Sequence, residues 1–482
     1  MMTGKVIAGS MVLALGVAVV VGSCTTDYVT GKKTFSLVGE SQEIAMGKEA
    51  DPQIVAEYGL YNDPALAGYV VGIGQALAAK SQRPDLAYTF RVLDSPVVNA
   101  FALPGGYVYV TRGILAHFNS EAQLAGVLGH EIGHVVARHG AEQMSRQQLA
   151  GLGLGLGAVF SETIREYAEI AGFGLQLMFL KFSRSQESES DMLGVEYSTK
   201  LGYDANEMAA FFGTLARMGE KSGGSLPSFM STHPDPGDRE VRVQQLSEEW
   251  SKKVNVQPAG RDRYEYLKRL EGMVHGDDPR QGYVEGEVFY HPALRFQFPI
   301  PKGWQLVNSP STVIMASPDK KAVMQLRLAE GDSPEKAADS FVAKNEVAVQ
   351  NRRSTTIHGL PAVIVTSTGE SEGMQIGIRS CFVKKETNVF ALHGYAEASG
   401  FAGYTAAFTG VTDGFQEVKD PKMLDKKPQR IHVKRAPKSG DLATVLQALG
   451  AKRESFEDTA ILNGLQLADS VEKGYWLKVV GD

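Results

Sequence analysis

The chain contains only two cysteines, Cys24 and Cys381, among its 482 residues. This low number excludes a disulfide-stabilised scaffold and a zinc finger built from thiolates. A metal in this protein must therefore be held by His, Glu or Asp. An excess of basic residues is also absent, since the formal net charge is −6. Because nucleic-acid-binding domains are usually strongly basic, we expect no nucleic acid among the partners.

The sequence also lacks a hydrophobic run long enough to span a membrane. The N-terminal run Val6–Val21 is shorter than the about 20 residues that a spanning helix needs. With one lysine before it and small residues after it, this run predicts a secretory signal peptide over residues 1–23. The small residues before Cys24 resemble the lipobox of bacterial lipoproteins. That resemblance implies a lipid anchor on Cys24 and, with Thr25 next, the outer membrane; a signal peptide with an incidental cysteine is the alternative.

Internal repeats are absent, and 43% hydrophobic with 22% charged residues is typical of a globular protein. The pattern is mainly helical over residues 40–270, except for strand-like stretches at Leu86–Leu93 and Tyr107–Thr111. From residue 282 to 416 it alternates as strands do, with one helical stretch at Ser333–Asn345. The strands expected there are Leu294–Phe298, Val313–Ala316, Val323–Leu328, Ala362–Thr366, Gln375–Val383 and Val389–Tyr395.

These changes of pattern predict a multidomain α+β protein. The expected parts are the signal peptide 1–23, a mainly helical domain with a small edge-strand sheet over 24–275, an α/β sandwich over 283–418, a basic linker over 419–430, and a small βααβ module over 431–482. The linker is expected to be exposed to solvent, because it is basic and contains two prolines.

A metal-binding motif lies in the first of these domains. Ser120 and the three residues after it fit a capping box, which predicts a helix beginning at Glu121. This helix carries the sequence HEIGH at residues 130–134. Residues four apart lie on one face of a helix, so His130 and His134 can bind one zinc ion. Glu131, beside the first histidine, is placed to take a proton from the attacking water. The alternative is a pair of hydrogen-bonded core histidines.

Two histidines leave a catalytic zinc one protein ligand short. The metzincin pattern would place a further histidine six residues after His134, but Gly140 stands there and His139 is out of step. A second predicted helix carries Glu187 and Asp191 four residues apart, hence on one face. Glu187 would bind zinc, while Asp191 would accept the N–H of a zinc-binding histidine and fix its tautomer. We expect Glu189, on another face, to be solvated; for this segment alone, an ordinary acidic solvated helix is the alternative.

Taken together, the motifs resemble the CAAX-prenyl-endopeptidase and HtpX-type gluzincin zinc peptidases, and most of all their secreted BepA-like periplasmic branch. The resembling segments lie within Val29–Leu270 and are NAFALPGG at 99–106, HEIGH at 130–134, SRSQESESD at 183–191, and STHP at 231–234 followed by Arg239. The resemblance implies a zinc-dependent endopeptidase with one zinc ion per chain. It implies His130, His134 and Glu187 as ligands.

The resemblance extends to the residues around the metal. It implies that Glu131 is the general base, that Asp191 orients a ligand, and that an edge strand pairs with an extended substrate. The implied substrate-binding residues are Asn99, Ala100, Phe101 and Ala102. His233 is implied as a regulatory fourth ligand that blocks the water position, although by sequence alone it is a loop histidine. Arg239 is a candidate substrate-binding or oxyanion residue, with a salt bridge to Asp191 as the alternative.

The remaining domains resemble non-catalytic modules. The segment HP at 291–292 with FQFPIPKGW at 296–304 resembles the PsbP/Mog-type α/β sandwich, and residues 431–482 follow the β-α-α-β order of a degenerate LysM module. The resemblance implies a lipid-anchored periplasmic endopeptidase whose substrates are unfolded or misassembled envelope proteins, with peptidoglycan as a partner of residues 431–482. The alternative is a low-turnover chaperone-like protein or a cell-wall-tethered binding protein on the same fold.

Overall fold

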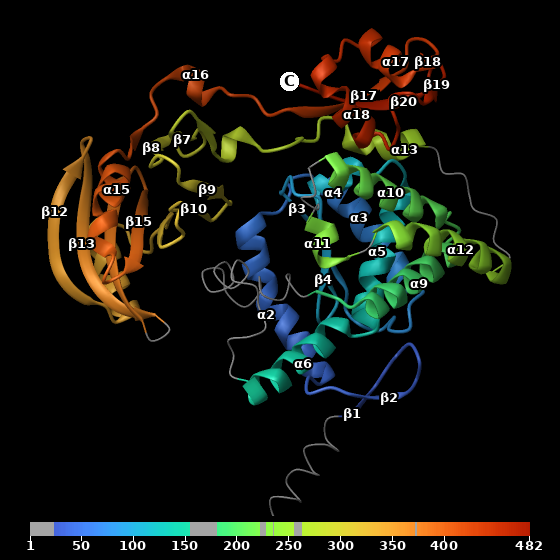
Figure 1. Cartoon of the computed structure of the whole chain (residues 1–482), viewed down its shortest axis with the longest axis horizontal. Helices are drawn as coiled ribbons and strands as arrows, with labels where there is room; N and C mark the ends of the chain where they lie inside the picture. Colours follow the sequence, from blue (N-terminus) through green and yellow to red (C-terminus); the bar gives the residue numbers. More distant parts are fainter. Residues whose placement is uncertain (1–23, 155–180, 222–227, 235, 255–262, 372–373) are drawn as a thin grey trace, which may run out of the picture. The chain divides into compact units, whose positions relative to one another are not determined.

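The computed structural model describes residues 24–154, 181–221, 228–234, 236–254, 263–371 and 374–482. They form two compact units (Figure 1). Within the described residues, the first unit comprises 24–55, 59–276 and 430–481, and the second comprises 56–58, 277–429 and 482. The expected signal peptide lies outside the described residues. Among the described helices, none is both long and apolar enough to cross a membrane.

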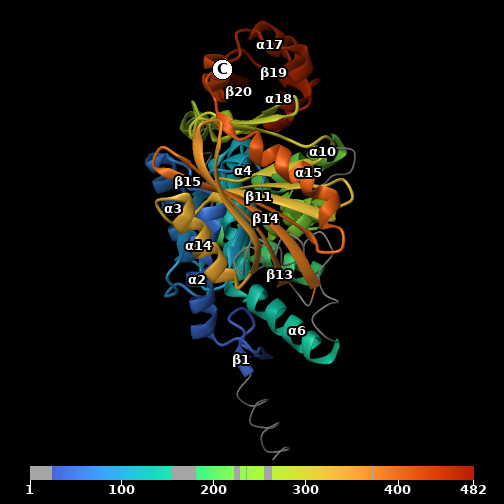
Figure 2. The ribbon, with the colours of Figure 1, turned by 90° about the vertical axis from the view of Figure 1, so that its left-hand side faces the viewer.

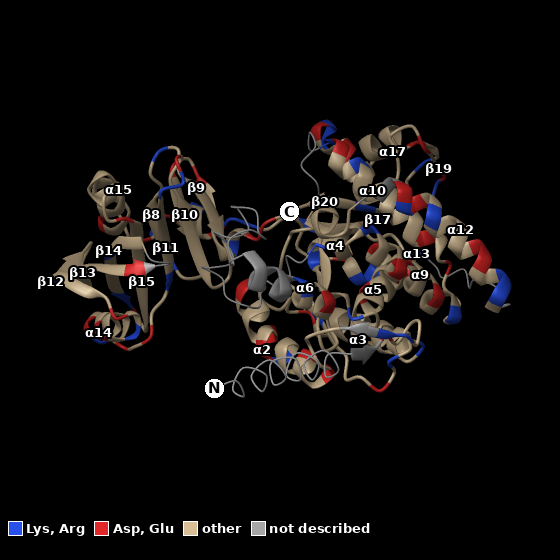
Figure 3. Ribbon diagram, turned by 60° about the horizontal axis from the view of Figure 1, so that its bottom comes forward, with Lys and Arg blue, Asp and Glu red and all other residues tan. Residues whose placement is uncertain are grey.

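The first unit is mainly helical, as predicted. Its helices are α2 (Glu40–Tyr58, which runs into the second unit), α3 (Pro64–Ala78), α4 (Arg112–His117), α5 (Glu121–Val136), α6 (His139–Leu154), α9 (Arg184–Lys200), α10 (Asn206–Lys221), α11 (Ser228–Thr232), α12 (Pro236–Val254) and α13 (Arg263–Leu267), followed by the 3₁₀ turn η1 (Lys268–Leu270). Basic and acidic residues both lie along α12 (Figure 3), as in an amphipathic surface helix.

A small sheet supports these helices. It contains β3 (Thr89–Leu93), β5 (Tyr107–Thr111) and β4 (Ala100–Leu103) in that spatial order. The strand predicted at Tyr107–Thr111 is confirmed, and the one predicted from Leu86 begins at Thr89 instead. β4 is antiparallel to β5 and forms one edge of the sheet. The turn between them needs glycine, because Gly105 has a φ of +81° and a Cβ there would lie 2.7 Å from Ile44 Cα.

Helix α5 lies at the centre of the unit, buried from Ala122 to Val136. It begins at Glu121, as predicted, and the side chain of Ser120 caps it by accepting the N–H of Gln123. Glycine lets α9 approach it closely: a Cβ at Gly129 would lie 3.1 Å from the Cα of Gly194. This close packing brings the side chains of α9 against the face of α5 that carries the HEIGH sequence.

The C-terminal residues contain two helices between two pairs of strands, so the expected βααβ order has one further short strand on each side. Their elements are β17 (Arg430–Arg435), β18 (Gly440–Asp441), α17 (Leu442–Ala448), η3 (Arg453–Ser455), α18 (Phe456–Leu462), β19 (Ser470–Val471) and β20 (Trp476–Gly481). β17 pairs with β20, and β18 pairs with β19. These residues have a small core of their own, but Ile431 and Leu462 belong to the main core of the first unit. The module is therefore built onto the first unit.

The second unit contains two antiparallel sheets, and the larger one has a helix on each face (Figure 2). Seven strands follow the order β12 (Ala348–Ile357), β13 (Leu360–Ser371), β14 (Met374–Lys385), β15 (Asn388–Glu397), β11 (Ala322–Leu328), β10 (Thr312–Ala316) and β9 (Gln305–Asn308); four more follow the order β16 (Gln416–Glu417), β8 (Phe296–Pro299), β7 (Val288–His291) and β6 (Tyr283–Glu285). Alternate residues of β13 face two separate cores, as Val363 and Ile364 do. Cys381 is buried, as expected.

Several elements of this unit differ from the sequence analysis. The helix α14 (Pro334–Asn345) was predicted, whereas α15 (Phe401–Asp413) and the strands β6, β7, β9, β12 and β16 were not. β12 is polar and almost wholly exposed, so it lacks the alternation that marks a strand in sequence. The expected linker 419–430 contains the short helix α16 (Pro421–Leu424), capped by Asp420, and ends in the first residue of β17.

Candidate metal centre

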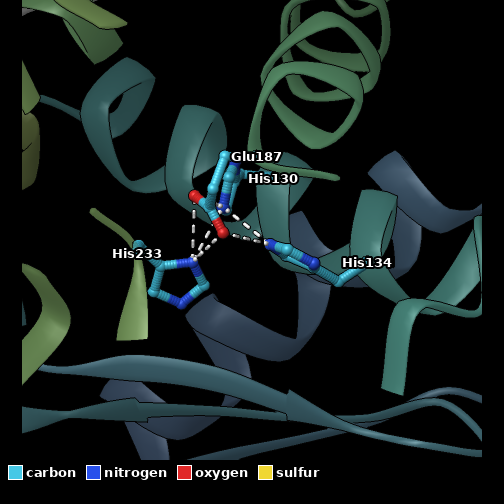
Figure 4. Close-up of side chains that lie close together, drawn as sticks. All are labelled: His130, His134, Glu187 and His233. Atoms are coloured by element: carbon cyan, nitrogen blue, oxygen red, sulfur yellow. Dashed lines mark hydrogen bonds and ion pairs between the residues drawn. The ribbon is translucent and has the colours of Figure 1, made fainter. Parts of the chain in front are cut away.

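Four side chains converge in the interior of the first unit (Figure 4). His130 and His134 come from α5, Glu187 from the first turn of α9, and His233 from the residue after α11. All four are buried, and one ligand atom of each lies within 4.8 Å of the other three. The structure thus brings together the residues that the sequence assigned to a metal, including the loop histidine.

The spacing of these atoms fits a metal ion. His130 Nε2 lies 3.0 Å from His134 Nε2 and 3.3 Å from His233 Nδ1. Glu187 Oε1 lies 3.0 Å from His233 Nδ1 and 3.4 Å from His134 Nε2. Zinc–nitrogen bonds of about 2.0–2.1 Å in a tetrahedron separate the ligand atoms by about 3.3–3.4 Å. Lone pairs this close repel one another, and a cation among them relieves the repulsion, so the donor set fits zinc.

Glu131 lies beside this group without a polar partner. Its side chain is 1% exposed, and neither carboxylate oxygen has a hydrogen-bond partner among the described residues. His233 Nε2, also unpartnered there, lies 3.6 Å from Oε1 of Glu131. Burial raises the pKa of Glu131, with the nearby His233 and His130 opposing the change. A buried carboxylate without a hydrogen-bond partner lowers the stability of the folded state. Such a group usually has a function.

Asp191 lies one turn beyond Glu187 and contacts the outer nitrogen of His130. The Nδ1–Oδ1 distance is 3.0 Å. The guanidinium of Arg239 donates to both oxygens of Asp191, at 2.7 and 2.9 Å, and Arg242 donates a third hydrogen bond at 2.9 Å. Burial alone would raise the pKa of Asp191, but Arg239 and His130 hold it well below its usual range. The carboxylate is therefore ionised and faces the N–H side of His130.

The position of Arg239 does not fit the expected role in substrate binding. Its side chain is 2% exposed, and Nη1 lies 3.0 Å from Oε2 of Glu187. With its other nitrogens on Asp191, the guanidinium joins two carboxylates and stacks on the ring of Phe212. This placement contradicts substrate contact and supports the alternative, a buried ion pair with Asp191.

The segment implied in substrate binding forms an edge of the site's sheet. Ala100, Phe101 and Ala102 lie in β4, and Asn99 precedes it. Among the described strands, β4 pairs only with β5 and lies at the edge of the sheet. Asn99 is buried, and its Oδ1 has no hydrogen-bond partner among the described residues.

The sequence analysis missed two side chains that contact His134. The ring of Phe182 stacks on it, with centroids 4.0 Å apart. His139 Nδ1 lies 3.0 Å from Nδ1 of His134. His139 was set aside because it is out of step with the metzincin pattern, whose further histidine comes six residues after the second. In the structure α5 ends at Val136, and Arg138 has a φ of +59°, which a sequence without glycine there does not reveal.

Comparison with known proteins also indicates a metal-dependent peptidase. The profile of Peptidase family M48 matches residues 64–249. The Beta-barrel assembly-enhancing protease of Yersinia pestis is 30% identical over 250 residues, covering 49% of this chain and 50% of that protein. The Putative beta-barrel assembly-enhancing protease of Vibrio cholerae is 34% identical over 189 residues, covering 37% and 38%. The Mitochondrial metalloendopeptidase OMA1 of Schizosaccharomyces pombe is 30% identical over 242 residues, covering 49% and 69%.

The chain thus spans half or less of the length of the two assembly-enhancing proteases. Among solved structures, cyanobacterial PsbP from Synechocystis is 11% identical with a TM-score of 0.24, over 28% of this chain and 98% of that one. A TM-score this low does not establish a shared fold, so the PsbP/Mog-type sandwich stays a prediction. The LysM-like module also stays a prediction.

The site combines two histidines one helical turn apart with a glutamate from a second helix. A further glutamate, next to the first histidine, has no hydrogen-bond partner among the described residues. This combination defines a metalloendopeptidase domain. The family profile and the relatives agree with this class. The chain belongs to Peptidase family M48.

Proposed function

We propose that the protein is a zinc-dependent endopeptidase that cleaves unfolded or misassembled proteins of the bacterial envelope. The observation that carries the proposal is the position of Glu131, whose buried carboxylate has no hydrogen-bond partner among the described residues and lies beside the ligand atoms of His130, His134 and Glu187. Zinc, when bound, would supply a Lewis acid that polarises the scissile carbonyl and activates water.

The residues of the chain would divide the remaining work. Glu131 would accept the proton of the attacking water and deliver it to the leaving amine, and burial favours this proton transfer by raising the pKa of its carboxyl. Asp191 would hold the tautomer of His130 that presents Nε2 to the metal. The edge strand β4 would pair with an extended substrate segment, so that main-chain hydrogen bonds bind many sequences.

His233 would keep this site closed. Catalytic zinc sites have three protein ligands and an open fourth position, whereas a site with four protein ligands is structural. Nδ1 of His233 lies close to the ligand atoms of the other three residues and would take the fourth position, and its Nε2 lies 3.6 Å from Oε1 of Glu131. Phe229 of α11 stacks on that ring at 4.5 Å, and its N–H donates to the carbonyl of Val98, next to the edge strand. Movement of α11 would therefore open the metal site and the substrate edge together.

The location and the substrates belong to the same proposal. The N-terminal sequence supports export and a lipid on Cys24, which would anchor the enzyme to a membrane facing the periplasm, preferably the outer membrane. The names of the Yersinia and Vibrio relatives refer to β-barrel assembly, and this supports envelope proteins as substrates. Peptidoglycan is a proposed partner of residues 431–482.

The position of His233 also favours the second candidate function, a chaperone-like protein with little turnover. The two are separated by casein cleavage with zinc-loaded protein from residue 24 onward, compared with His233→Ala. We expect one zinc per chain and faster cleavage by His233→Ala. A denatured outer-membrane β-barrel protein should be cleaved in preference to its folded form. Bound zinc without cleavage by either protein would support the chaperone-like function instead.

A further inference from the structure

The two histidines of α5 differ in what faces their outer ring nitrogens. Nδ1 of His130 faces a carboxylate directly, with Oδ1 of Asp191 at 3.0 Å. Nδ1 of His134 faces another imidazole, with Nδ1 of His139 at 3.0 Å. Both pairs of side chains are buried. A metal-binding histidine almost always donates its second N–H to an acceptor, and among the described residues Nδ1 of His139 is the atom that faces Nδ1 of His134.

A carboxylate lies at the far end of this second pair as well. Nε2 of His139 is 3.1 Å from Oε2 of Glu189, whose side chain is 30% exposed. The expectation that Glu189 would be simply solvated is therefore wrong: it is partly exposed and bound to a buried histidine. The hydroxyl of Ser190 is also near Nδ1 of His139, at 3.3 Å, which is longer than the contact with His134.

One set of tautomers satisfies all three side chains. If Nε2 of His134 offers its lone pair to the metal, its proton must be on Nδ1. Nδ1 of His139 must then carry a lone pair to accept that proton, which leaves the proton of His139 on Nε2, pointing at Glu189. In this arrangement each donor nitrogen meets an acceptor, and the series of hydrogen bonds ends at the carboxylate of Glu189.

We propose that His139 and Glu189 are positioning residues that fix the tautomer and ring orientation of His134 and so strengthen metal binding. This inference rests on the proposed function, since it takes His134 as a metal ligand. His130 and His134 would then each be oriented by a carboxylate of α9: Asp191 acts directly, and Glu189 acts through one imidazole.

The backbone explains how His139 reaches this position. Arg138 adopts a left-handed φ of +59°, which breaks the helix between α5 and α6. That conformation is strained for a residue with a side chain, and ion pairing holds it: Nε of Arg138 lies 2.7 Å from Oε2 of Glu43, and Nη2 donates to the carbonyl of Val38 at 2.8 Å. His139 is consequently the first residue of α6 and faces back to His134.

Metal affinity of the full-length chain tests the proposal, with zinc as the probe in competition with a chromophoric chelator. His139→Phe keeps a buried ring and removes the acceptor, and it should weaken zinc binding by about 10- to 100-fold. His139→Asn keeps an acceptor near the place of Nδ1 and should lose less than about tenfold. Glu189→Ala changes a partly exposed side chain and should fold normally, with an intermediate loss.

Coupling between the positions separates orientation from simple packing. If Glu189 acts through His139, Glu189→Ala should cost little further affinity in the His139→Asn background. The midpoint of thermal unfolding of the metal-free proteins reports packing separately. His117→Phe is the matched control: Nδ1 of this histidine lies 2.8 Å from the carbonyl oxygen of Gly113 on its own helix, the residue is not part of the metal centre, and its replacement should leave zinc affinity unchanged.

The outcomes are distinct. Zinc affinity of His139→Phe and Glu189→Ala within twofold of the wild type, about 0.4 kcal/mol, would overturn the positioning role, even if the metal-free proteins were less stable. A wild-type chain that binds no zinc would overturn the metal centre and this inference with it. Zinc binding by the wild type together with unaffected variants would overturn this inference alone.

Discussion

The ammonium nitrogen of Lys478 in β20 lies 2.6 Å from the carbonyl oxygen of Ala116 and 2.8 Å from that of Phe118. The side chain is fully buried, and both of these partners are neutral carbonyls at the end of α4. Burial therefore lowers the pKa of Lys478 well below its ordinary value of 10.5. Lys478 thus donates hydrogen bonds to two backbone carbonyls of the turn that leads into α5.

The first prediction concerns the pH dependence of stability. The unfolded chain binds a proton at Lys478 more readily than the folded chain does, because the pKa is lowered by folding. The stabilising contribution is therefore complete above pH 10.5 and decreases as the pH falls towards the folded pKa. The free energy of unfolding in urea, measured from pH 7 to 10, should increase with pH more steeply for the wild type than for Lys478→Met.

The control is Lys434→Met, which removes an exposed lysine from the neighbouring strand β17. Its pH dependence should match that of the wild type. Parallel curves for the wild type and Lys478→Met would show that Lys478 titrates alike in both states, contrary to its burial.

The second prediction is that residues 430–482 are part of the peptidase fold. Ile431 and Leu462 lie in the main core of the first unit, and Arg263 of α13 donates hydrogen bonds to Asn119, Asn463 and Trp476. Deleting residues 430–482 removes these core contacts and the hydrogen bonds near Asn119, which lies just before the start of α5 in the sequence. We therefore expect the shortened chain to unfold at a much lower temperature and to lose zinc binding.

A second deletion serves as the comparison. Val274 and Arg430 form an antiparallel bridge, so a short Gly-Ser turn can replace residues 277–429 and leave the first unit continuous. This shortened protein should melt cooperatively and bind zinc. A folded, zinc-binding chain after deletion of 430–482 would instead favour a detachable wall-binding module.

The third prediction concerns the buried arginine at the metal centre. Arg239→Met leaves Glu187 and Asp191 with less positive charge beside them. Removing one partner from a buried ion pair typically costs about 3–5 kcal/mol, so the metal-free protein should be destabilised by this order. The zinc-loaded protein should be less affected, because the cation replaces charge next to Glu187. Urea unfolding with and without zinc measures both values.

Arg242→Met is the matched control for this variant. Arg242 donates to the same Asp191 but is 35% exposed, and ion pairs near the surface contribute about 0–1 kcal/mol. Equal destabilisation by the two variants would mean that burial of Arg239 between the carboxylates is not what stabilises the centre.

Much of the site could be predicted because it depends on local periodicity. The spacing of His130 and His134 on one helix, and of Glu187 and Asp191 on another, fixes which side chains share a face. The capping signal at Ser120 placed the start of the first helix. Such signals lie within a few residues of one another, so a single sequence contains them.

The remainder depends on contacts between distant segments or on backbone conformations that the residues do not announce. His139 reaches His134 only because Arg138 is held in a left-handed conformation by Glu43, some 95 residues away in sequence. The packing of Ile431 and Leu462 into the first unit joins segments separated by the whole second unit. Neither relationship has a local pattern, and both required the structure.

The most direct test of the central claim is the rate of casein cleavage by zinc-loaded His233→Ala compared with that of His233→Ala/Glu131→Gln. Both proteins should contain one zinc per chain, because Glu131 is not among the ligand atoms. The first should cleave casein, and the second should be slower by at least about 10²- to 10⁴-fold, the usual contribution of a general base. Equal cleavage by the two proteins, or the absence of zinc from both, would contradict a metalloendopeptidase that uses Glu131.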